Sequence, residues 1–198
     1  WQWAVLLLTF FISSSILTRA FKKRKSDLSE KFSKGGQRDA GQVLGNGGLA
    51  TLLAGLTFFY PDDPRLWLGF AAALAASNAD TWATELGVLN PHPPRLITHP
   101  SRIVEKGTSG GISLVGTLAA LAGAGLIGSL AGFLNPSGIS WTTAVIVTLA
   151  GLLGSLFDSI LGATVQAIYR CPTCDKETEQ HPIHSCGTPT TQIRGWKW

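Results

Sequence analysis

Five long apolar stretches dominate the pattern of hydrophobic and polar residues along the chain. They cover approximately residues 3–18, 42–60, 66–89, 109–134 and 141–169. A helix rises about 1.5 Å per residue, so about 20 residues cross the roughly 30 Å hydrocarbon core of a bilayer. The pattern therefore predicts an all-α, polytopic transmembrane bundle of about five spans.

The composition favours the same class. Hydrophobic residues make up 45% of the 198 residues and charged residues only 14%, with a mean hydropathy of +0.22. A soluble protein with buried helices is the alternative. It is disfavoured because apolar stretches of this length recur with so few charges inside them.

The basic residues predict the orientation of the bundle. Of the 16 Lys and Arg residues, all but Arg65 follow the first, third or fifth stretch. The positive-inside rule assigns these three segments to the cytoplasmic, or stromal, side. The net charge of +4 is then a topology signal and does not indicate nucleic-acid binding. We expect a helical domain, residues 1–169, with its active site on that side, and a tail, residues 170–198.

The third stretch ends in an unusually polar segment, "SNADTWATELG". At about 100° per residue, one sector of roughly 160° holds all its polar side chains, which are Ser77, Asn78, Asp80, Thr81, Thr84 and Glu85. Such a face cannot contact lipid, so it must line the bundle interior or an aqueous cleft. A hydrogen-bond network between helices is the alternative. The two carboxylates favour a site, because ionised acids in a bundle need cations or metals.

The fifth stretch repeats this pattern in "GSLFDSILGATVQ". Ser155, Asp158, Gly162 and Gln166 lie within about 80° of one another on a helix. The alternative is a packing face with a single satisfied Asp. Because Asp80 and Asp158 both lie toward the predicted cytoplasmic side, we expect them to share a water-filled cleft.

The loop between the third and fourth stretches, "PHPPRLITHPSRIVEKGTSGG", carries candidate phosphate ligands. Its prolines predict an extended connection rather than a helix. It brings His99, Arg102 and Lys106 to a glycine turn, which consists of Gly107, Thr108, Ser109, Gly110 and Gly111. Backbone N–H groups at a glycine-rich helix start, with nearby cations, suit a phosphate, although a solvated basic loop is the common alternative. Combined with the two acidic faces, these residues can bind a divalent cation and a phosphate ester.

A further polar segment, "RDAGQVLGNGG", leads into the second stretch. Asp39, Gln42 and Asn46 recur there at helical spacing and would line the same cleft. Pairing of Arg38 with Asp39 at the membrane interface is an equally supported alternative.

All three cysteines lie in the tail, in "CPTCDKETEQHPIHSCGT". On the cytoplasmic side a structural disulfide is disfavoured, so a closed tetrahedral zinc site is expected. Cys171, Cys174, Cys186 and His184 fill its four positions, and His181 is the rival for the histidine position. A Cys171–Cys174 disulfide is the remaining alternative.

Five motifs in order carry a family resemblance: "RDAGQVLGNGG", "SNADTWATELG", "KGTSGG", "FDSILGATVQ" and "CPTC…HSCGTPT…RGW". On these motifs the chain resembles the family of integral membrane proteins that includes plant phytyl-phosphate kinase, of the vitamin E (tocopherol) pathway, and vertebrate transmembrane protein 19. Members usually carry further membrane segments at both ends. With no Met in the chain, we expect this sequence to be a piece of a longer protein.

The resemblance implies transfer of a nucleoside triphosphate's γ-phosphate, with CTP the expected donor, to an isoprenoid monophosphate such as phytyl or geranylgeranyl phosphate. It implies Mg²⁺ on Asp80, Glu85 and Asp158, with Arg102, Lys106 and the glycine turn on the phosphates. The remaining substrate-binding candidates are Asp39, Asn46, Ser77, Asn78, Thr84, His99 and Gln166. A nucleotidyltransferase that forms a CDP-lipid and a lipid-phosphate transporter are the alternatives. No P-loop motif is present.

Overall fold

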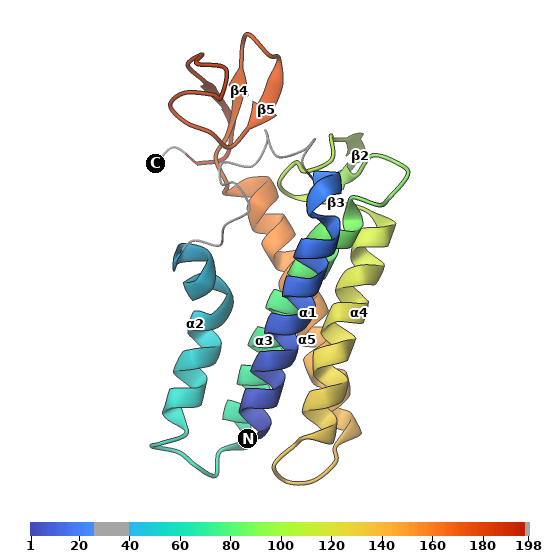
Figure 1. Cartoon of the computed structure of the whole chain (residues 1–198), viewed down its shortest axis with the longest axis vertical. Coiled ribbons are helices and arrows are strands. Elements are labelled where there is room, and N and C mark those ends of the chain that lie inside the picture. The colour runs from blue at the N-terminus through green and yellow to red at the C-terminus, as the bar shows by residue number, and fades with distance from the viewer. Residues whose placement is uncertain (26–39, 197–198) are drawn as a thin grey trace.

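The structure, a computed structural model, describes residues 1–25 and 40–196. It contains five α-helices, each overlapping one predicted stretch: α1 (Gln2–Lys25), α2 (Ala40–Leu56), α3 (Pro64–Gly87), α4 (Leu114–Phe133) and α5 (Trp141–Thr164) (Figure 1). The prediction of a mainly helical bundle is thereby confirmed.

Three of the described helices are long and apolar enough to cross a membrane. They are α1, over Gln2–Phe21, together with the whole of α4 and α5. Helix α2 is shorter, with 17 residues. Helix α3 has 24 residues, but its polar second half lowers its hydropathy. Length and composition thus support three candidate spans among the described helices, and the full set of five spans stays a prediction.

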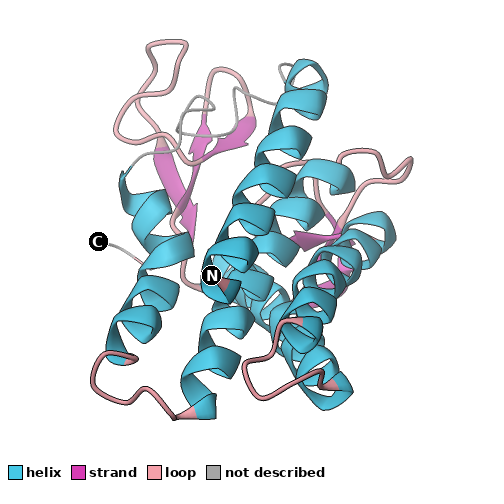
Figure 2. Cartoon of the chain, turned by 60° about the horizontal axis from the view of Figure 1, so that its bottom comes forward, coloured by secondary structure: helices cyan, strands magenta, loops and turns pink. Residues whose placement is uncertain are grey.

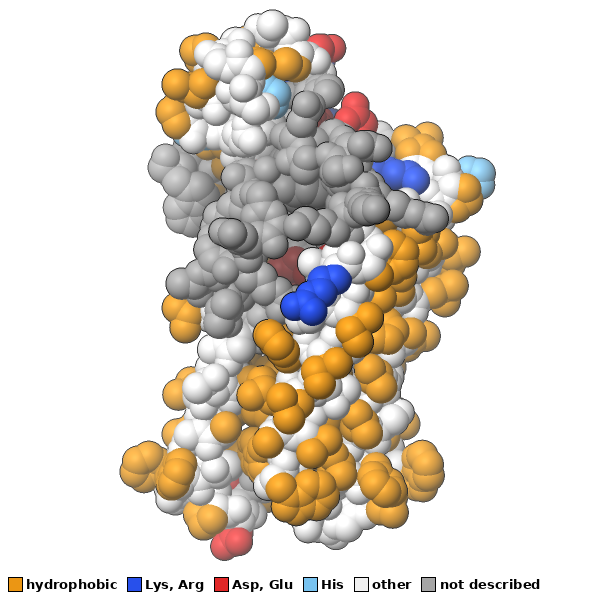
Figure 3. All heavy atoms as spheres, viewed as in Figure 1, with side chains coloured by type: hydrophobic (Ala, Val, Ile, Leu, Met, Phe, Trp, Pro, Cys, Tyr) orange, Lys and Arg blue, Asp and Glu red, His pale blue; other side chains and the backbone are white. Residues whose placement is uncertain are grey.

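Helix α3 occupies the centre of the bundle and packs against each of the other four helices. The exposed large hydrophobic side chains of the described helices lie on α1, α2, α4 and α5, and none lies on α3. Hydrophobic side chains are also spread over the lower part of the bundle face seen in Figure 3. Because its neighbours shield α3 from lipid, this helix can carry polar residues at low energetic cost.

Small residues bring α3, α4 and α5 into close contact. A Cβ atom on Gly123 of α4 would lie 2.9 Å from Cγ of Trp82. A Cβ atom on Gly151 or Gly154 of α5 would lie 2.7 Å from the Cβ atom of Ala75 or Ala76, respectively. Close backbone approach of this kind is the usual basis of helix packing in membranes, where van der Waals contact replaces the hydrophobic effect.

Two small antiparallel sheets correct the all-α prediction. The loop between α3 and α4 forms β1 (Arg95–Leu96), β2 (His99–Ile103) and β3 (Gly111–Ile112), in the order β2-β1-β3. The tail and the residues that lead into it form β4 (Ile168–Cys171), β5 (Lys176–Thr178) and β6 (Thr191–Arg194), in the order β5-β4-β6. Prolines interrupt both segments and disfavour long helices there, as the loop's prolines indicated. The class is therefore mainly helical with two small sheets.

Both sheets lie at one end of the bundle (Figures 1 and 2). The C-terminal end of α1 points to the same end, whereas the short loops between α2 and α3 and between α4 and α5 lie at the other. The described basic residues after the first, third and fifth stretches therefore gather at the sheet end, and Arg65 lies opposite. This separation is the one that the positive-inside prediction requires.

Candidate functional site

A cavity of about 230 Å³ lies at the sheet end of the bundle, between α3, α4, α5 and the glycine turn. Its wall is rich in groups that bind cations or phosphate. These include Asp80, Thr84, Lys106, Thr108, Ser109, Ser113, Thr117, Ser155, Asp158, Ser159 and Glu179, besides the three glycines of the turn. We call this the first cavity.

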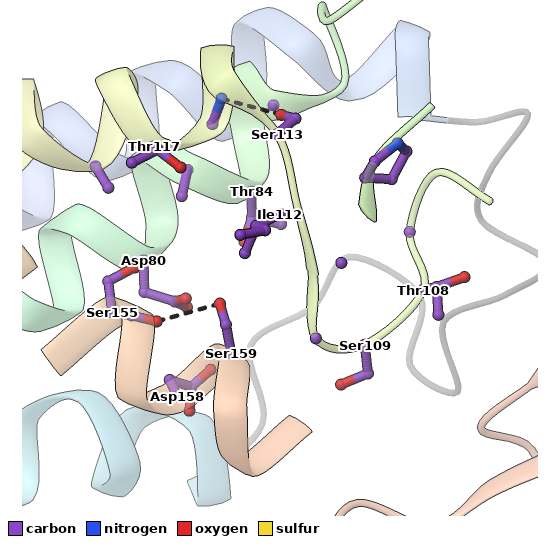
Figure 4. Close-up of a pocket in the computed structure, with 18 of the residues that line it drawn as sticks. Asp80, Thr84, Thr108, Ser109, Ile112, Ser113, Thr117, Ser155, Asp158 and Ser159 are labelled. Carbon is purple, nitrogen blue, oxygen red and sulfur yellow. Dashed lines mark hydrogen bonds between the residues drawn. The ribbon is translucent and has the colours of Figure 1, made fainter. Parts of the chain in front are cut away.

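Two carboxylates reach the first cavity from different helices, Asp80 from α3 and Asp158 from α5. Figure 4 shows both of them beside Ser155 and Ser159, with Thr108 and Ser109 across the cavity. The Ser159 hydroxyl donates to the Ser155 carbonyl oxygen at 3.2 Å. Close packing of α5 on α3 brings the two acids together. Carboxylate and hydroxyl oxygens are the ligands that Mg²⁺ prefers, so this pair could hold a divalent cation.

The glycine turn docks on the end of α5. Gly107 and Gly110 have φ values of 85° and 79°, which residues other than glycine rarely adopt. A Cβ atom on Gly110 would lie 2.5 Å from the Cβ atom of Ala163. The turn leads directly to α4, whose N-cap Ser113 accepts a hydrogen bond from the Gly116 N–H at 3.1 Å. Backbone N–H groups near a helix start favour an anion there.

Lys106 lines the first cavity, but its ammonium group has local partners. It donates to the carbonyl oxygens of Val88 at 3.1 Å and Asn90 at 2.6 Å. Both carbonyls follow the C-terminus of α3, where the helix dipole favours a cation. These bonds fix a positive charge at the edge of the cavity.

The polar face of α3 serves two different neighbours. Asp80 and Thr84 line the first cavity, whereas Asn78 and Glu85 are buried and contact α1. The Asn78 amide oxygen accepts from the hydroxyls of Ser13 and Ser14, and its amide nitrogen donates to the carbonyl oxygen of Gly123. The Glu85 carboxylate accepts from the hydroxyl of Thr18 at 3.0 Å. The alternative interpretation of this face, a hydrogen-bond network between helices, therefore applies to the edge that faces α1. Glu85 is therefore separated from Asp80 and Asp158, although all three were predicted to bind magnesium.

Several other predicted site residues also lie outside the wall of the first cavity. His99 and Arg102 are exposed on β2, and a guanidinium nitrogen of Arg102 lies 3.8 Å from the Glu177 carboxylate. The Ser77 hydroxyl donates to the carbonyl oxygen of Asn46 at 2.9 Å, which ties α2 to α3. The side chain of Asp39 lies outside the described part of the structure, so its predicted role stays a prediction.

The tail supplies an acidic residue that the sequence did not indicate, Glu179. It lines the first cavity and accepts a hydrogen bond from the Gln166 amide at 2.8 Å. The oxygen of the same amide accepts from the Ser109 hydroxyl. Gln166, predicted as a substrate ligand, therefore connects the glycine turn to the tail. No spacing signal could reveal Glu179, because only the folding of β5 back onto β4 brings it to the bundle.

A second cavity, of about 480 Å³, lies next to the first. Asp158 and Glu179 belong to the walls of both. The second cavity is also lined by Tyr169 and His181, whose rings stack 4.4 Å apart. Ligands in the two cavities could therefore both reach these carboxylates.

The tail gathers its cysteines into a metal-binding arrangement, the cysteine cluster, made of Cys171, Cys174, His184 and Cys186. The four ligand atoms all lie within 4.8 Å of one another. The Sγ atoms of Cys171 and Cys186 are 3.4 Å apart, and no disulfide joins any of the three cysteines. Zinc–sulfur bonds of about 2.3 Å at tetrahedral angles place sulfur atoms roughly 3.8 Å apart, so the cluster fits such an ion. It includes His184 rather than His181.

Two tight turns shape the cysteine cluster. Asp175 and Gly187, with φ values of 52° and 83°, directly follow Cys174 and Cys186. Their N–H groups bond back to the carbonyl oxygens of Cys171 and His184, at 2.9 and 2.8 Å. Hydrogen bonding with Thr188, and to a smaller extent with His184, lowers the pKa of Cys186 to about 5. Hydrogen bonding with Cys186 raises the pKa of Cys174 to about 11. Metal binding requires deprotonated thiols, and the lowered pKa of Cys186 favours that state.

Apolar spanning helices with a polar cavity at one end define an integral membrane protein. The family model described as integral membrane protein DUF92 matches residues 1–198, and the chain belongs to that family. Protein PGR of Arabidopsis thaliana is 36% identical over 197 residues, covering 88% of this chain and 68% of the relative. An uncharacterized membrane protein of Methanocaldococcus jannaschii is 37% identical over 165 residues, covering 82% of this chain and 64% of the relative.

A more distant relative is the protein named VTE6, chloroplastic, of Arabidopsis thaliana. It is 26% identical over 166 residues, covering 82% of this chain and 49% of the relative. The chain thus spans about half to two thirds of the length of these relatives. No solved structure matches it significantly. These matches confirm the family that the sequence motifs indicated.

Proposed function

We propose that the protein is a membrane-embedded kinase that transfers the γ-phosphate of a nucleoside triphosphate to an isoprenoid monophosphate, giving the diphosphate. One observation carries the proposal: Asp80 and Asp158 face a single cavity together with the glycine turn. The resemblance to the family of plant phytyl-phosphate kinase, and the distant similarity to VTE6, support this reaction over other uses of the same groups.

In this proposal Asp80 and Asp158 hold Mg²⁺, and Ser155 and Ser159 add hydroxyl oxygens beside them. The metal would neutralise charge on the transferred phosphoryl group. Backbone N–H groups of the glycine turn, with the hydroxyls of Thr108 and Ser109, would hold the phosphate oxygens. The positive charge of Lys106 at the cavity edge supports binding of a polyanion.

The chemistry needs no dedicated base. An oxygen of the acceptor phosphate attacks the γ-phosphorus, a new P–O bond forms, and the bond to the β–γ bridging oxygen breaks as the nucleoside diphosphate leaves. The acceptor oxygen is already ionised near neutral pH. Positioning and charge neutralisation can therefore supply the catalysis.

The two adjoining cavities support a reaction between two phosphorylated substrates. Asp158 and Glu179 lie in both walls, where a donor and an acceptor could meet. The exposed apolar side chains of α4 and α5 offer a surface for an isoprenoid tail, for example at Leu118 and Phe157. CTP as donor and phytyl or geranylgeranyl phosphate as acceptor are the specific substrates that we propose.

The test is a transfer assay with the full-length protein in lipid nanodiscs. CTP or ATP labelled at the γ-phosphate is combined with phytyl or geranylgeranyl phosphate, with and without Mg²⁺, and products are identified by mass. We expect addition of one phosphate, lost in Asp80→Asn. Asp62→Asn, on an exposed residue at the opposite end of the bundle, is the matched control and should stay active.

Two outcomes would overturn the proposal. Addition of a whole CMP would identify a nucleotidyltransferase that forms a CDP-lipid. Binding of Mg²⁺–nucleotide with no lipid product, across all donors and acceptors, would refute both enzyme activities and favour a lipid-phosphate transporter.

A further inference from the structure

The tail contacts the glycine turn through a short series of hydrogen bonds. The Ser109 hydroxyl donates to the Gln166 amide oxygen, and the Gln166 amide nitrogen donates to the Glu179 carboxylate at 2.8 Å. From the other side, the guanidinium group of Arg194 donates to the backbone carbonyl oxygen of Ser109 at 3.0 Å. Both the side chain and the backbone of Ser109 are therefore held by, or through, residues of the tail.

The tail is also attached to the end of α5. The N–H of Trp196 donates to the carbonyl oxygen of Val165 at 3.0 Å. Gly195, with φ 85°, lies so close to the carbonyl of Gln166 that a Cβ atom would fall within 3 Å of it. A displacement of β6 would therefore move Gln166 as well as Arg194.

The positions of Glu179 and Arg194 depend on one small sheet. Glu179 directly follows β5, and Arg194 ends β6 opposite Ile168 of β4. Strand β4 ends at Cys171, a member of the cysteine cluster. The cluster thus lies at the far end of the strand that pairs with both β5 and β6.

This sheet has little hydrophobic core of its own. Its buried apolar side chains are those of Ile168 and Cys171, and the other buried residues of the described tail are polar: Thr178, His184 and Thr190. A three-stranded sheet of this length with so little apolar burial needs a cross-link or a metal to hold its shape. The cysteine cluster is the part of the tail that can supply one.

We propose that the cysteine cluster is a zinc-dependent clamp that positions the glycine turn. Zn²⁺ bound by Cys171, Cys174, His184 and Cys186 fixes the tail sheet, and the sheet holds the turn through Gln166, Glu179 and Arg194. These three act as positioning residues. The clamp itself does not require kinase activity; only the benefit of ordering the turn for phosphate binding rests on the proposed function.

The experiment measures zinc content and hydrogen exchange in the full-length protein in nanodiscs. Amide exchange is followed in the peptide that contains the glycine turn, in the absence of nucleotide. In wild type we expect one zinc per chain and slow exchange. Cys174→Ser should lose the zinc, and exchange in the turn should accelerate at least tenfold, because local opening is no longer opposed by the tail.

Two further variants keep the test decisive if Cys174→Ser fails to fold. Gln166→Ala removes the connection but leaves the cluster intact, so it should retain zinc while exchange in the turn accelerates. Thr191→Ala is the control: its exposed hydroxyl donates a long hydrogen bond, 3.5 Å, to the carbonyl oxygen of Arg170 within the tail, so neither zinc content nor exchange in the turn should change.

The clamp would be overturned if amide exchange in the glycine turn were unchanged in Gln166→Ala. It would also be overturned if, in the zinc-free protein, the tail exchanged fast while the glycine turn still exchanged slowly. Full zinc loading of Cys174→Ser would also do so, because the cluster would not be the site. The readouts need no substrate, so they separate the two hypotheses. An inactive protein with zinc-dependent exchange refutes the kinase alone, and an active protein whose exchange is independent of zinc refutes the clamp alone.

Discussion

Replacement of Gly110 by alanine tests whether the shape of the glycine turn matters for function. The alanine would have to adopt a φ of 79°, which costs about 1–2 kcal/mol for a residue with a Cβ atom. That atom would lie 2.5 Å from the Cβ atom of Ala163, and overpacking of this kind adds about 1–3 kcal/mol. The native turn is therefore destabilised by about 2–5 kcal/mol.

Each 1.4 kcal/mol corresponds to about tenfold in the ratio of two populations. We therefore expect Gly110→Ala to lower the ratio of native to distorted turn at least tenfold, and phosphoryl transfer to fall. The bundle should still assemble, because the turn lies at its end. Thermal unfolding in detergent checks assembly, and the transfer assay in nanodiscs measures the functional loss.

Two variants separate strain from steric overlap. Gly138→Ala introduces the same kind of strain, at φ 102°, in a loop with no atom within 4 Å of the new Cβ atom, so its transfer rate should equal that of wild type. Ala163→Gly combined with Gly110→Ala removes the contact with the Ala163 Cβ atom, but the new Cβ atom would still lie 2.7 Å from the backbone Cα and N atoms of residue 163, so the double variant should recover little activity. Full activity of Gly110→Ala, or full recovery in the double variant, would refute the packing argument.

Two substitutions and two measurements on the tail cysteines probe other parts of the structure. Asp158→Asn should abolish metal-dependent transfer while the unfolding temperature stays within a few degrees of wild type; retained transfer would exclude this carboxylate as a metal ligand. Asn78→Leu should lower the free energy of unfolding by about 1–3 kcal/mol, because it leaves buried hydroxyls and a carbonyl without their partner, and unchanged thermal unfolding would contradict that. In metal-free protein at pH 7, iodoacetamide should label Cys186 before Cys174, since their pKa values are about 5 and about 11, and mass spectrometry of the tail reads the order. The pKa of Cys186 is lower in the folded tail than in the unfolded chain, so the Cys186 thiolate stabilises the metal-free tail. This stabilisation is complete above about pH 9 and is lost as pH falls through about 5. Hydrogen exchange of the tail, measured against pH, checks this.

Much of the site was predictable from local pattern. The angular positions of Asp80 and Asp158 and the glycines of the turn point to one polar region at one end of the bundle. The cysteine spacing and the nearby histidines likewise indicated a metal-binding tail. These features could be predicted because they depend on helical periodicity, backbone geometry and ligand chemistry, all of which act over a few residues.

The division of the polar face of α3 could not be predicted. On an ideal helix Asn78 and Glu85 point in nearly the same direction, as do Asp80 and Thr84. Periodicity gives the angle between these pairs, but the neighbouring helix on each side decides their roles. Here α1 contacts the first pair, and α4 and α5 enclose the second.

The sequence by itself determined the helices, the asymmetry of basic charge and the family, because each follows from local composition or from ordered motifs. Only the tertiary structure decided that Glu179 and Arg194 reach the glycine turn, and that Arg102 stays outside the first cavity. These contacts join segments far apart in the chain. Their geometry depends on how the tail sheet folds back onto the bundle, and no local pattern of residues encodes that path.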